Sequence, residues 1–132
     1  IGDWAFGECT GLTSITIPNS EESIGMHAFS GCTGLTSITI PNSVKSIEGN
    51  AFYGCTGLTS ITLPKTLTFI DECVFSSCKN LRKIIYQGTM EEWNNITLTK
   101  AWHQYVYNIS IQCSDGVIVS ASSGFEDLTI RT

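Results

Sequence analysis

Apolar and polar residues alternate in short segments that recur along the first two thirds of the chain. Residues 58–63 (LTSITL) place apolar side chains at positions 61 and 63, with polar side chains before and between them. This alternation predicts a strand with one buried face, and Pro64 ends the strand because proline cannot donate a hydrogen bond to a sheet. Residues 51–55 place apolar side chains at positions 51, 52 and 55. This spacing favours a single helical turn that faces the core.

The whole pattern repeats along the chain with a constant 23-residue period. Five columns keep one residue type through four successive units: Ile1, Ile24, Ile47 and Ile70; Phe6, Phe29, Phe52 and Phe75; Cys9, Cys32, Cys55 and Cys78; Leu12, Leu35, Leu58 and Leu81; Ile15, Ile38, Ile61 and Ile84. A period in the low twenties is typical of solenoids, in which each unit buries its apolar face against its neighbours. We therefore predict a right-handed, β-rich repeat solenoid over residues 1–85. It has about four units, each with one short strand and one short helical turn.

The 23-residue spacing ends after Gln87, and residues 86–132 are predicted to form a C-terminal α/β capping segment. Thr89, followed three residues later by Glu92, has the form of a capping box and indicates a short helix that ends near Asn95. We expect the cap to cover the open edge of the last repeat, which would otherwise pair with other chains. Strands are predicted at residues 106–112, 117–119 and 128–131, with a turn at residues 114–116.

Six cysteines raise the question of disulfide bonds, but four of them form one column of the repeat. Equivalent positions of adjacent turns lie about 4.8 Å apart with parallel side chains. That geometry suits a ladder of buried free thiols better than bridges, whose Cβ atoms must approach to about 3.8 Å. Cys73 and Cys113 lie outside the column, and the sequence leaves open whether they pair.

The second unit carries its features in the order Ile24, Ala28-Phe29-Ser30-Gly31-Cys32, Leu35 and Ile38-Thr39-Ile40-Pro41-Asn42-Ser43-Val44. This pattern resembles the BspA-like leucine-rich repeat family over residues 1 to about 85. Residues 86–132 resemble the segment that often closes such arrays. The resemblance implies extracellular or cell-surface proteins of bacteria and of some parasitic protists, with roles in adhesion and protein–protein contact. It implies no catalytic residues.

Charged residues are sparse, at 14% of the chain, and the formal net charge is −5. Nucleic acid is therefore not expected as a partner, because phosphate binding needs clustered Lys and Arg. Lys79, Arg82 and Lys83 form one small basic group, for which we favour a solvated patch over an anion site. No apolar run reaches the roughly 20 residues that a membrane helix needs. Since the chain starts inside a repeat unit and without Met, we expect it to be a piece of a longer protein.

We predict a non-catalytic protein without a cofactor or a metal site. Glu91 and Glu92 are adjacent, so on a helix they diverge by about 100° and cannot face each other as an acid/base pair. His27 and His103 lie far apart in the sequence, and no Cys/His spacing matches a zinc site. Phosphate-binding glycine loops and dinucleotide fingerprints are also missing from the sequence.

Two sets of surface residues are candidates for binding. The first is a row of outward, weakly charged positions along the strands: Ser14, Thr16, Ser37, Thr39, Ser60, Thr62 and Lys83. Such rows also stabilise sheets through cross-strand ladders, and the two roles are compatible. The second is an aromatic patch in the cap: Trp93, Trp102, Tyr105 and Tyr107. These rings either pack against the last repeat or form an exposed platform for sugar rings or a protein anchor.

The leading hypothesis is an adhesion or binding module of a cell-surface or secreted protein that contacts other proteins through the solenoid surface. We expect an extracellular or cell-surface location and a protein ligand, such as a host extracellular or surface protein. One alternative is a structural spacer that displays a neighbouring domain. Another is carbohydrate binding through the aromatic residues of the cap, with a glycan as the ligand.

Overall fold

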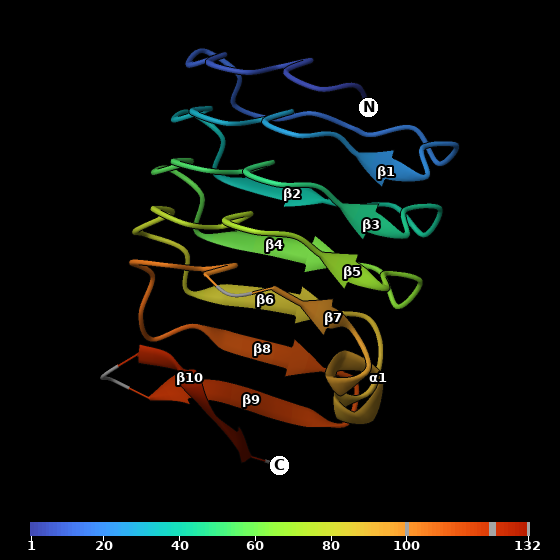
Figure 1. The fold of residues 1–132 in the computed structure, drawn as a ribbon, viewed down its shortest axis with the longest axis vertical. Coiled ribbons are helices and arrows are strands. Elements are labelled where there is room, and N and C mark those ends of the chain that lie inside the picture. Colours follow the sequence, from blue (N-terminus) through green and yellow to red (C-terminus); the bar gives the residue numbers. More distant parts are fainter. Residues whose placement is uncertain (100, 122–123, 132) are drawn as a thin grey trace.

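The computed structural model describes residues 1–99, 101–121 and 124–131 and places the side chains of residues 1–99 and 101–119. Its elements are β1 (Ser23–Ile24), β2 (Ser37–Thr39), β3 (Ser46–Ile47), β4 (Ser60–Leu63), β5 (Phe69–Ile70), β6 (Lys83–Tyr86), α1 (Met90–Asn94), β7 (Thr97–Leu98), β8 (Ser110–Cys113), β9 (Gly116–Ala121) and β10 (Gly124–Arg131). The chain winds into turns that stack one on the next, with β9 and β10 at the C-terminal end of the stack (Figure 1). The architecture is therefore the predicted repeat solenoid.

Six of the strands form one sheet, in the order β10-β9-β8-β6-β4-β2. β2, β4 and β6 pair in parallel with a register of one repeat, so that Ile38 lies beside Ile61 and Ile61 beside Ile84. These three isoleucines are buried. The polar residues between them face outward, because successive side chains of a strand point to opposite faces. The strand predicted in each of these units is confirmed.

A second sheet has the order β1-β3-β5-β7. Its strands contain two residues each. The second residue is a buried isoleucine in three of them: Ile24, Ile47 and Ile70. The sequence predicts one strand per unit because two residues are too few to show an alternating pattern. Each full turn of the stack therefore pairs with its neighbours in two sheets.

The segment predicted to be a helical turn forms a run of tight turns instead. The Cys55 N–H donates to the Phe52 carbonyl within the unit (3.2 Å), whereas the Phe52 N–H donates to the Val74 carbonyl of the next unit (3.0 Å). Asn50 and Gly54 have φ angles of 58° and 69°. Backbone in this left-handed region cannot continue a right-handed helix. The turns thus supply a third ladder of hydrogen bonds between units, which the spacing of apolar residues does not reveal.

Stacked phenylalanine rings fill the centre of the solenoid. Phe29, Phe52 and Phe75 are fully buried. The ring centroids lie 5.2 Å apart between Phe29 and Phe52 and 5.8 Å apart between Phe52 and Phe75, with the planes within 15° of parallel. Exact repetition of one residue type lets each ring meet the same surface on both sides.

The cysteine column forms a ladder in which each buried thiol bonds to the unit before it. Cys32, Cys55 and Cys78 are buried, as predicted. Their thiols donate to the carbonyl of the phenylalanine in the preceding unit, with sulfur–oxygen distances of 2.9–3.0 Å. The prediction of burial is wrong for Cys9, which is exposed because the first turn is packed by the second turn alone. The two cysteines outside the column, whose pairing the sequence leaves open, are free thiols.

The stack continues beyond residue 86 with a changed spacing. Thr89 caps α1 and forms the predicted capping box with Glu92. β7 then pairs in parallel with β5, so that Thr97 lies beside Phe69, and β8 pairs with β6, so that Ser110 lies beside Lys83. The sequence separation between these paired strands is longer than the 23-residue period because α1 is inserted between them. The sequence period therefore ends, but the turns continue to stack. β9 pairs antiparallel with β8 across the predicted turn. The division of the chain into an array and a cap at residue 85 stays a prediction.

Gly57 lies where the backbones of two units approach closely. A Cβ atom at this position would lie 2.3 Å from the Thr33 carbonyl oxygen, whereas a Cβ atom at Gly54 would meet nothing within 4 Å. We expect Gly57→Ala to lower the free energy of unfolding by about 3 kcal/mol, because the two backbones must move apart. Gly54→Ala should cost about 1 kcal/mol for its left-handed φ alone. Urea unfolding of both variants measures the difference, and equal losses would argue against the close approach.

Candidate binding surface

The structure places the outward residues of the strands on one surface, which we call the strand face. It consists of two parallel rows, one formed by Ser37, Ser60 and Lys83 and the other by Thr39, Thr62 and Ile85. The two residues from β4 are half-buried, and the residues from β2 and β6 are exposed. The backbone pairing of the sheet fixes the spacing within each row at about 4.8 Å. The residues predicted from β2, β4 and β6 therefore do share one face.

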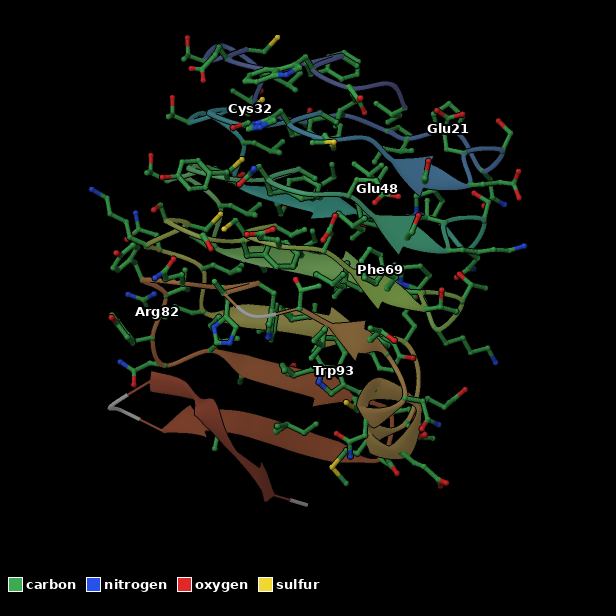
Figure 2. All side chains as sticks on the ribbon, in the orientation of Figure 1. Glu21, Cys32, Glu48, Phe69, Arg82 and Trp93 are labelled. Carbon is green, nitrogen blue, oxygen red and sulfur yellow. The ribbon has the colours of Figure 1, made fainter. Side chains whose placement is uncertain are left out.

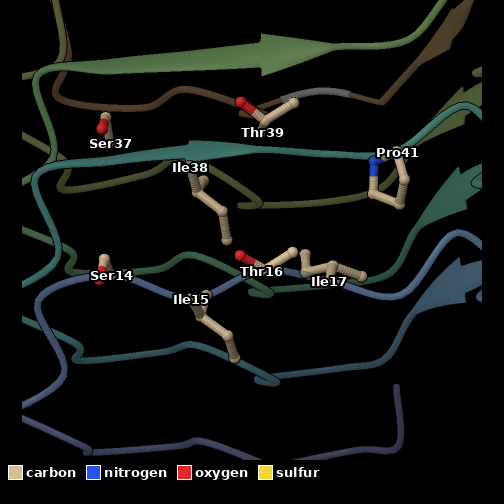
Figure 3. Close-up of a pocket in the computed structure, with 8 residues that line it drawn as sticks. All are labelled: Ser14, Ile15, Thr16, Ile17, Ser37, Ile38, Thr39 and Pro41. Carbon is tan, nitrogen blue, oxygen red and sulfur yellow. The ribbon is translucent and has the colours of Figure 1, made fainter.

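A hollow of about 320 Å³ lies at the N-terminal end of the strand face, between the first and second turns. Figure 3 shows Ser14 beside Ser37 and Thr16 beside Thr39, so the hydroxyl rows continue into the first turn. The complete lining is Ser14, Ile15, Thr16, Ile17, Ser37, Ile38, Thr39 and Pro41. Its volume is at the lower end of the range for ligand pockets. The hollow combines hydroxyl groups with an isoleucine-lined floor.

Charge is nearly absent from this surface. Of the residues that form the strand face and line the hollow, Lys83 alone is charged. Serine and threonine hydroxyls can both donate and accept hydrogen bonds. The surface can therefore contact neutral polar groups, such as peptide or sugar groups, without first separating ion pairs. The strand face and the lining of the hollow contain no Asp, Glu, His or Cys.

The four aromatic residues predicted as a patch in the cap are separated by the structure. Trp93 and Trp102 are buried, with exposed fractions of 1% and 5%, and their ring centroids lie 5.8 Å apart. Tyr105 and Tyr107 lie on the surface, with exposed fractions of 62% and 44%. The prediction of one shared patch needs correction. The indole rings extend the core beyond Phe75, and only the tyrosines are available to a ligand.

The buried thiols of the cysteine column have pKa values above those of free cysteine. Burial raises the pKa of Cys32 to about 11. The neighbouring Cys78 thiol, together with burial, raises the pKa of Cys55. Since the thiolate is the reactive form of cysteine, these two side chains are unreactive at neutral pH. Their role is to pack the core and to bond to the preceding unit.

The two histidines lie in different environments. His27 is half-buried and stacks on Trp4, with ring centroids 4.1 Å apart. His103 is fully buried, and burial lowers the pKa of its imidazole to about 4. Within the residues that the structure describes, no group of three His, Cys, Asp or Glu side chains is arranged to hold a metal ion.

The structure also brings together two groups that the sequence treats separately. The Ser77 N–H donates to the Gln104 carbonyl (2.9 Å), so the exposed tyrosines occupy the turn that stacks on the basic group. Thr97 of β7 lies beside Phe69 of β5. If the same spacing is applied to the residues that follow, Tyr105 is the counterpart of Ser77, and Tyr107 is the counterpart of Lys79. The longer spacing between the fourth and fifth turns could have shown that the tyrosines stack on the basic group. The sequence does not reveal this spacing, because α1 is inserted between the two turns.

No helix in the described part of the chain is long and apolar enough to cross a membrane.

Comparison with known proteins assigns the repeat. The model of the BspA type leucine rich repeat region matches residues 1–125 in six copies. None of the curated proteins compared matches the chain.

Three solved structures share the fold. A leucine rich cell surface protein from Faecalibacterium prausnitzii A2-165 is 37% identical, with a TM-score of 0.72 over 74% of this chain and 26% of that one. A T. pallidum leucine rich repeat protein is 30% identical, with a TM-score of 0.71 over 84% of this chain and 50% of that one. A leucine-rich repeat protein from Bacteroides ovatus is 23% identical and shows the fold alone, with a TM-score of 0.62 over 87% and 35% of the two chains. The chain spans half or less of the length of each of these structures.

Proposed function

The chain belongs to the BspA-type leucine-rich repeat family, and on this premise we propose that it is a non-catalytic module that binds a protein partner through the strand face. We further propose that it acts at the cell surface or outside the cell. The similar structure from Faecalibacterium prausnitzii is described as a cell surface protein, which supports this location. The observation that carries the proposal is the pair of rows, with Lys83 as their one charged residue, held in register on a paired sheet.

The rigidity of the strand face supports a role in binding. Its side chains project from three paired strands, of which β4 and β6 pair on both sides and β2 pairs with β4, so little conformational freedom is lost when a partner docks. A protein interface of standard size covers about 800 Å² on each partner. In a solenoid the same rows lengthen with each added unit. A repeat array can therefore reach this area without any deep pocket.

Charge introduced into the rows should weaken binding. Glutamate at Thr39 and Thr62 would place two carboxylates on the strand face, and each would lose hydration when a partner covers it. We expect Thr39→Glu/Thr62→Glu to weaken binding to a partner selected from an array of purified matrix and serum proteins by about tenfold or more. Surface plasmon resonance with the immobilised chain measures the change.

The matched control places the same two charges on the other sheet. Ser23 of β1 and Ser46 of β3 lie beside each other and are half-buried. The variant Ser23→Glu/Ser46→Glu changes the net charge of the chain by the same amount as the strand-face variant. Melting temperatures of both variants report whether the fold is kept. Undiminished binding by the strand-face variant, or an equal loss in the control, would exclude the strand face as the site.

A spacer function is the second candidate, because a solenoid lengthens by stacking further units of the same kind. In that case the array positions another domain and contributes no contact of its own. Deleting whole turns from the parent protein would then shift the reach of the neighbouring domain without changing its affinity. Carbohydrate binding through the cap now rests on Tyr105 and Tyr107, because both tryptophans are buried.

A further inference from the structure

Basic and aromatic side chains gather at one corner of the fourth and fifth turns. The sequence alone favours a solvated patch for the basic group, but with the tyrosines beside it we propose that this corner binds a sulfated polysaccharide. We call it the basic–aromatic corner; it consists of Lys79, Arg82, Lys83, Tyr105 and Tyr107. All five side chains are exposed. Figure 2 labels Arg82 at the edge of the stack away from α1. The site lies beyond the strand face, with which it shares only Lys83.

The cations of the corner are free to meet an outside anion. The ion pairs within the described residues involve Glu21 and Glu22 and leave Lys79, Arg82 and Lys83 without an acidic partner. Arg82 directs its Nη1 group to the carbonyls of Lys79 (2.8 Å) and Leu81 (3.0 Å). These bonds hold the guanidinium in place and leave its other N–H groups for a ligand.

Negative charge is missing from the surrounding sequence. Residues 73–90 and 93–114 contain no Asp or Glu. The two carboxylates between these segments belong to α1, which lies at the opposite edge of the stack (Figure 1). In a chain with a net charge of −5, the corner itself carries three positive charges, and the acidic residues of β10, Glu126 and Asp127, lie beyond β8 and β9 in the sheet. The corner attracts an anion over a distance of about one Debye length, near 8 Å at physiological salt.

The corner is also where the repeat changes its residues. In the first three units the positions of Lys79 and Arg82 are occupied by threonine, and that of Lys83 by serine. The stack above is built with those smaller side chains at the same positions. The basic residues are thus not required by the packing, which indicates a role in contact with another molecule.

Tyr105 supplies an independent observation. Its φ angle of 67° is the one that the turn takes in every unit, since the corresponding residues Glu8, Gly31, Gly54 and Ser77 have φ angles of 60–74°. A tyrosine with left-handed backbone costs stability compared with glycine. The ring gains little in return, since it remains 62% exposed. The exposed ring therefore stands at the corner where a ligand can reach it.

The arrangement favours a sugar polymer over an acidic peptide. Tyr107 lies one turn from Lys79 in the stack, which is a step of about 4.8 Å. A cation and a flat ring thus stand side by side along the stack. A sulfated polysaccharide presents anionic groups and sugar rings at similar, regular intervals, and amphipathic rings such as tyrosine suit both. An acidic peptide supplies the charge without the regular rings.

Binding of the full chain to dextran sulfate tests the proposal, with uncharged dextran and polyglutamate as reference polymers. We expect Lys79→Gln/Arg82→Gln to weaken dextran sulfate binding about tenfold, and Lys45→Gln/Lys65→Gln, which removes the same charge elsewhere, to change it less than about twofold. Tyr105→Gly suits the left-handed backbone, and it should weaken dextran sulfate binding about threefold while leaving polyglutamate binding unchanged.

Three results would overturn the proposal. The first is no binding of dextran sulfate at low salt. The second is an equal loss in the two charge-matched double variants, which would show unspecific attraction. The third is polyglutamate binding as tight as dextran sulfate binding with Tyr105→Gly affecting neither, which would indicate a site for acidic peptides. The Thr39→Glu/Thr62→Glu variant should retain dextran sulfate binding, so this proposal and that for the strand face can fail separately.

Discussion

Replacing Phe52 by alanine is expected to lower the free energy of unfolding by about 3–5 kcal/mol. The Phe52 ring is fully buried and stacks on Phe29 at 5.2 Å and on Phe75 at 5.8 Å. Its removal leaves a cavity between two units that are held in place by three hydrogen-bonded ladders and cannot collapse onto it. Because each unit contacts only its neighbours, the loss should also reduce the cooperativity between the two halves of the stack.

Urea unfolding followed by circular dichroism measures this effect, and the next residue provides a control. Tyr53 follows Phe52 directly and is 42% exposed. Tyr53→Ala should change stability by no more than about 0.5 kcal/mol, as is usual for surface positions. Similar losses in the two variants would mean that the phenylalanine column does not form the centre of the fold.

Acidification is expected to destabilise the chain by about 3 kcal/mol between pH 6.5 and pH 4 through His103 alone. Burial lowers the pKa of this imidazole from 6.5 to about 4 in the folded chain. The unfolded chain therefore binds a proton in this range that the folded chain does not bind. The contribution of neutral His103 is complete above pH 6.5 and is lost as the pH falls toward 4.

The measurement is the free energy of unfolding in urea at pH 7, 5.5 and 4, compared with His103→Phe. The spacing between β5 and β7 makes His103 the counterpart of Phe75. His103 therefore occupies the position of the phenylalanine column in the fifth turn, and a phenyl ring is expected to fit there. Carboxylates titrate equally in both proteins and cancel in the difference. A variant with the same pH dependence as the original chain would contradict the assignment of this effect to His103.

The repeat period made the core predictable from the sequence. Identical residues at a constant step must occupy equivalent places, so the burial of Phe52 and Cys55 follows from the pattern. The outward position of Thr39 and Thr62 follows in the same way from alternation along the strands. In each case the stacking of equivalent units determines which residues a side chain contacts and whether it points inward or outward.

Features that depend on single backbone angles or on the insertion were not predictable. The two-residue strands of the second sheet are too short to alternate, and left-handed φ values at Asn50 and Gly54 have no hydrophobic signature. The aromatic residues of the cap were grouped by sequence proximity. The turn after α1 instead directs Trp102 into the core and Tyr105 to the surface, because it follows the repeat at a longer offset.

The binding role of the strand face can be tested directly by photo-crosslinking at single positions. A photoreactive amino acid is introduced at Thr39 on the strand face or, as the control, at Ser46 on the second sheet, and the chain is irradiated with a bound protein partner. We predict a covalent adduct from position 39 and none from position 46. An adduct from position 46 alone, or from neither position while the partner remains bound, would contradict binding through the strand face.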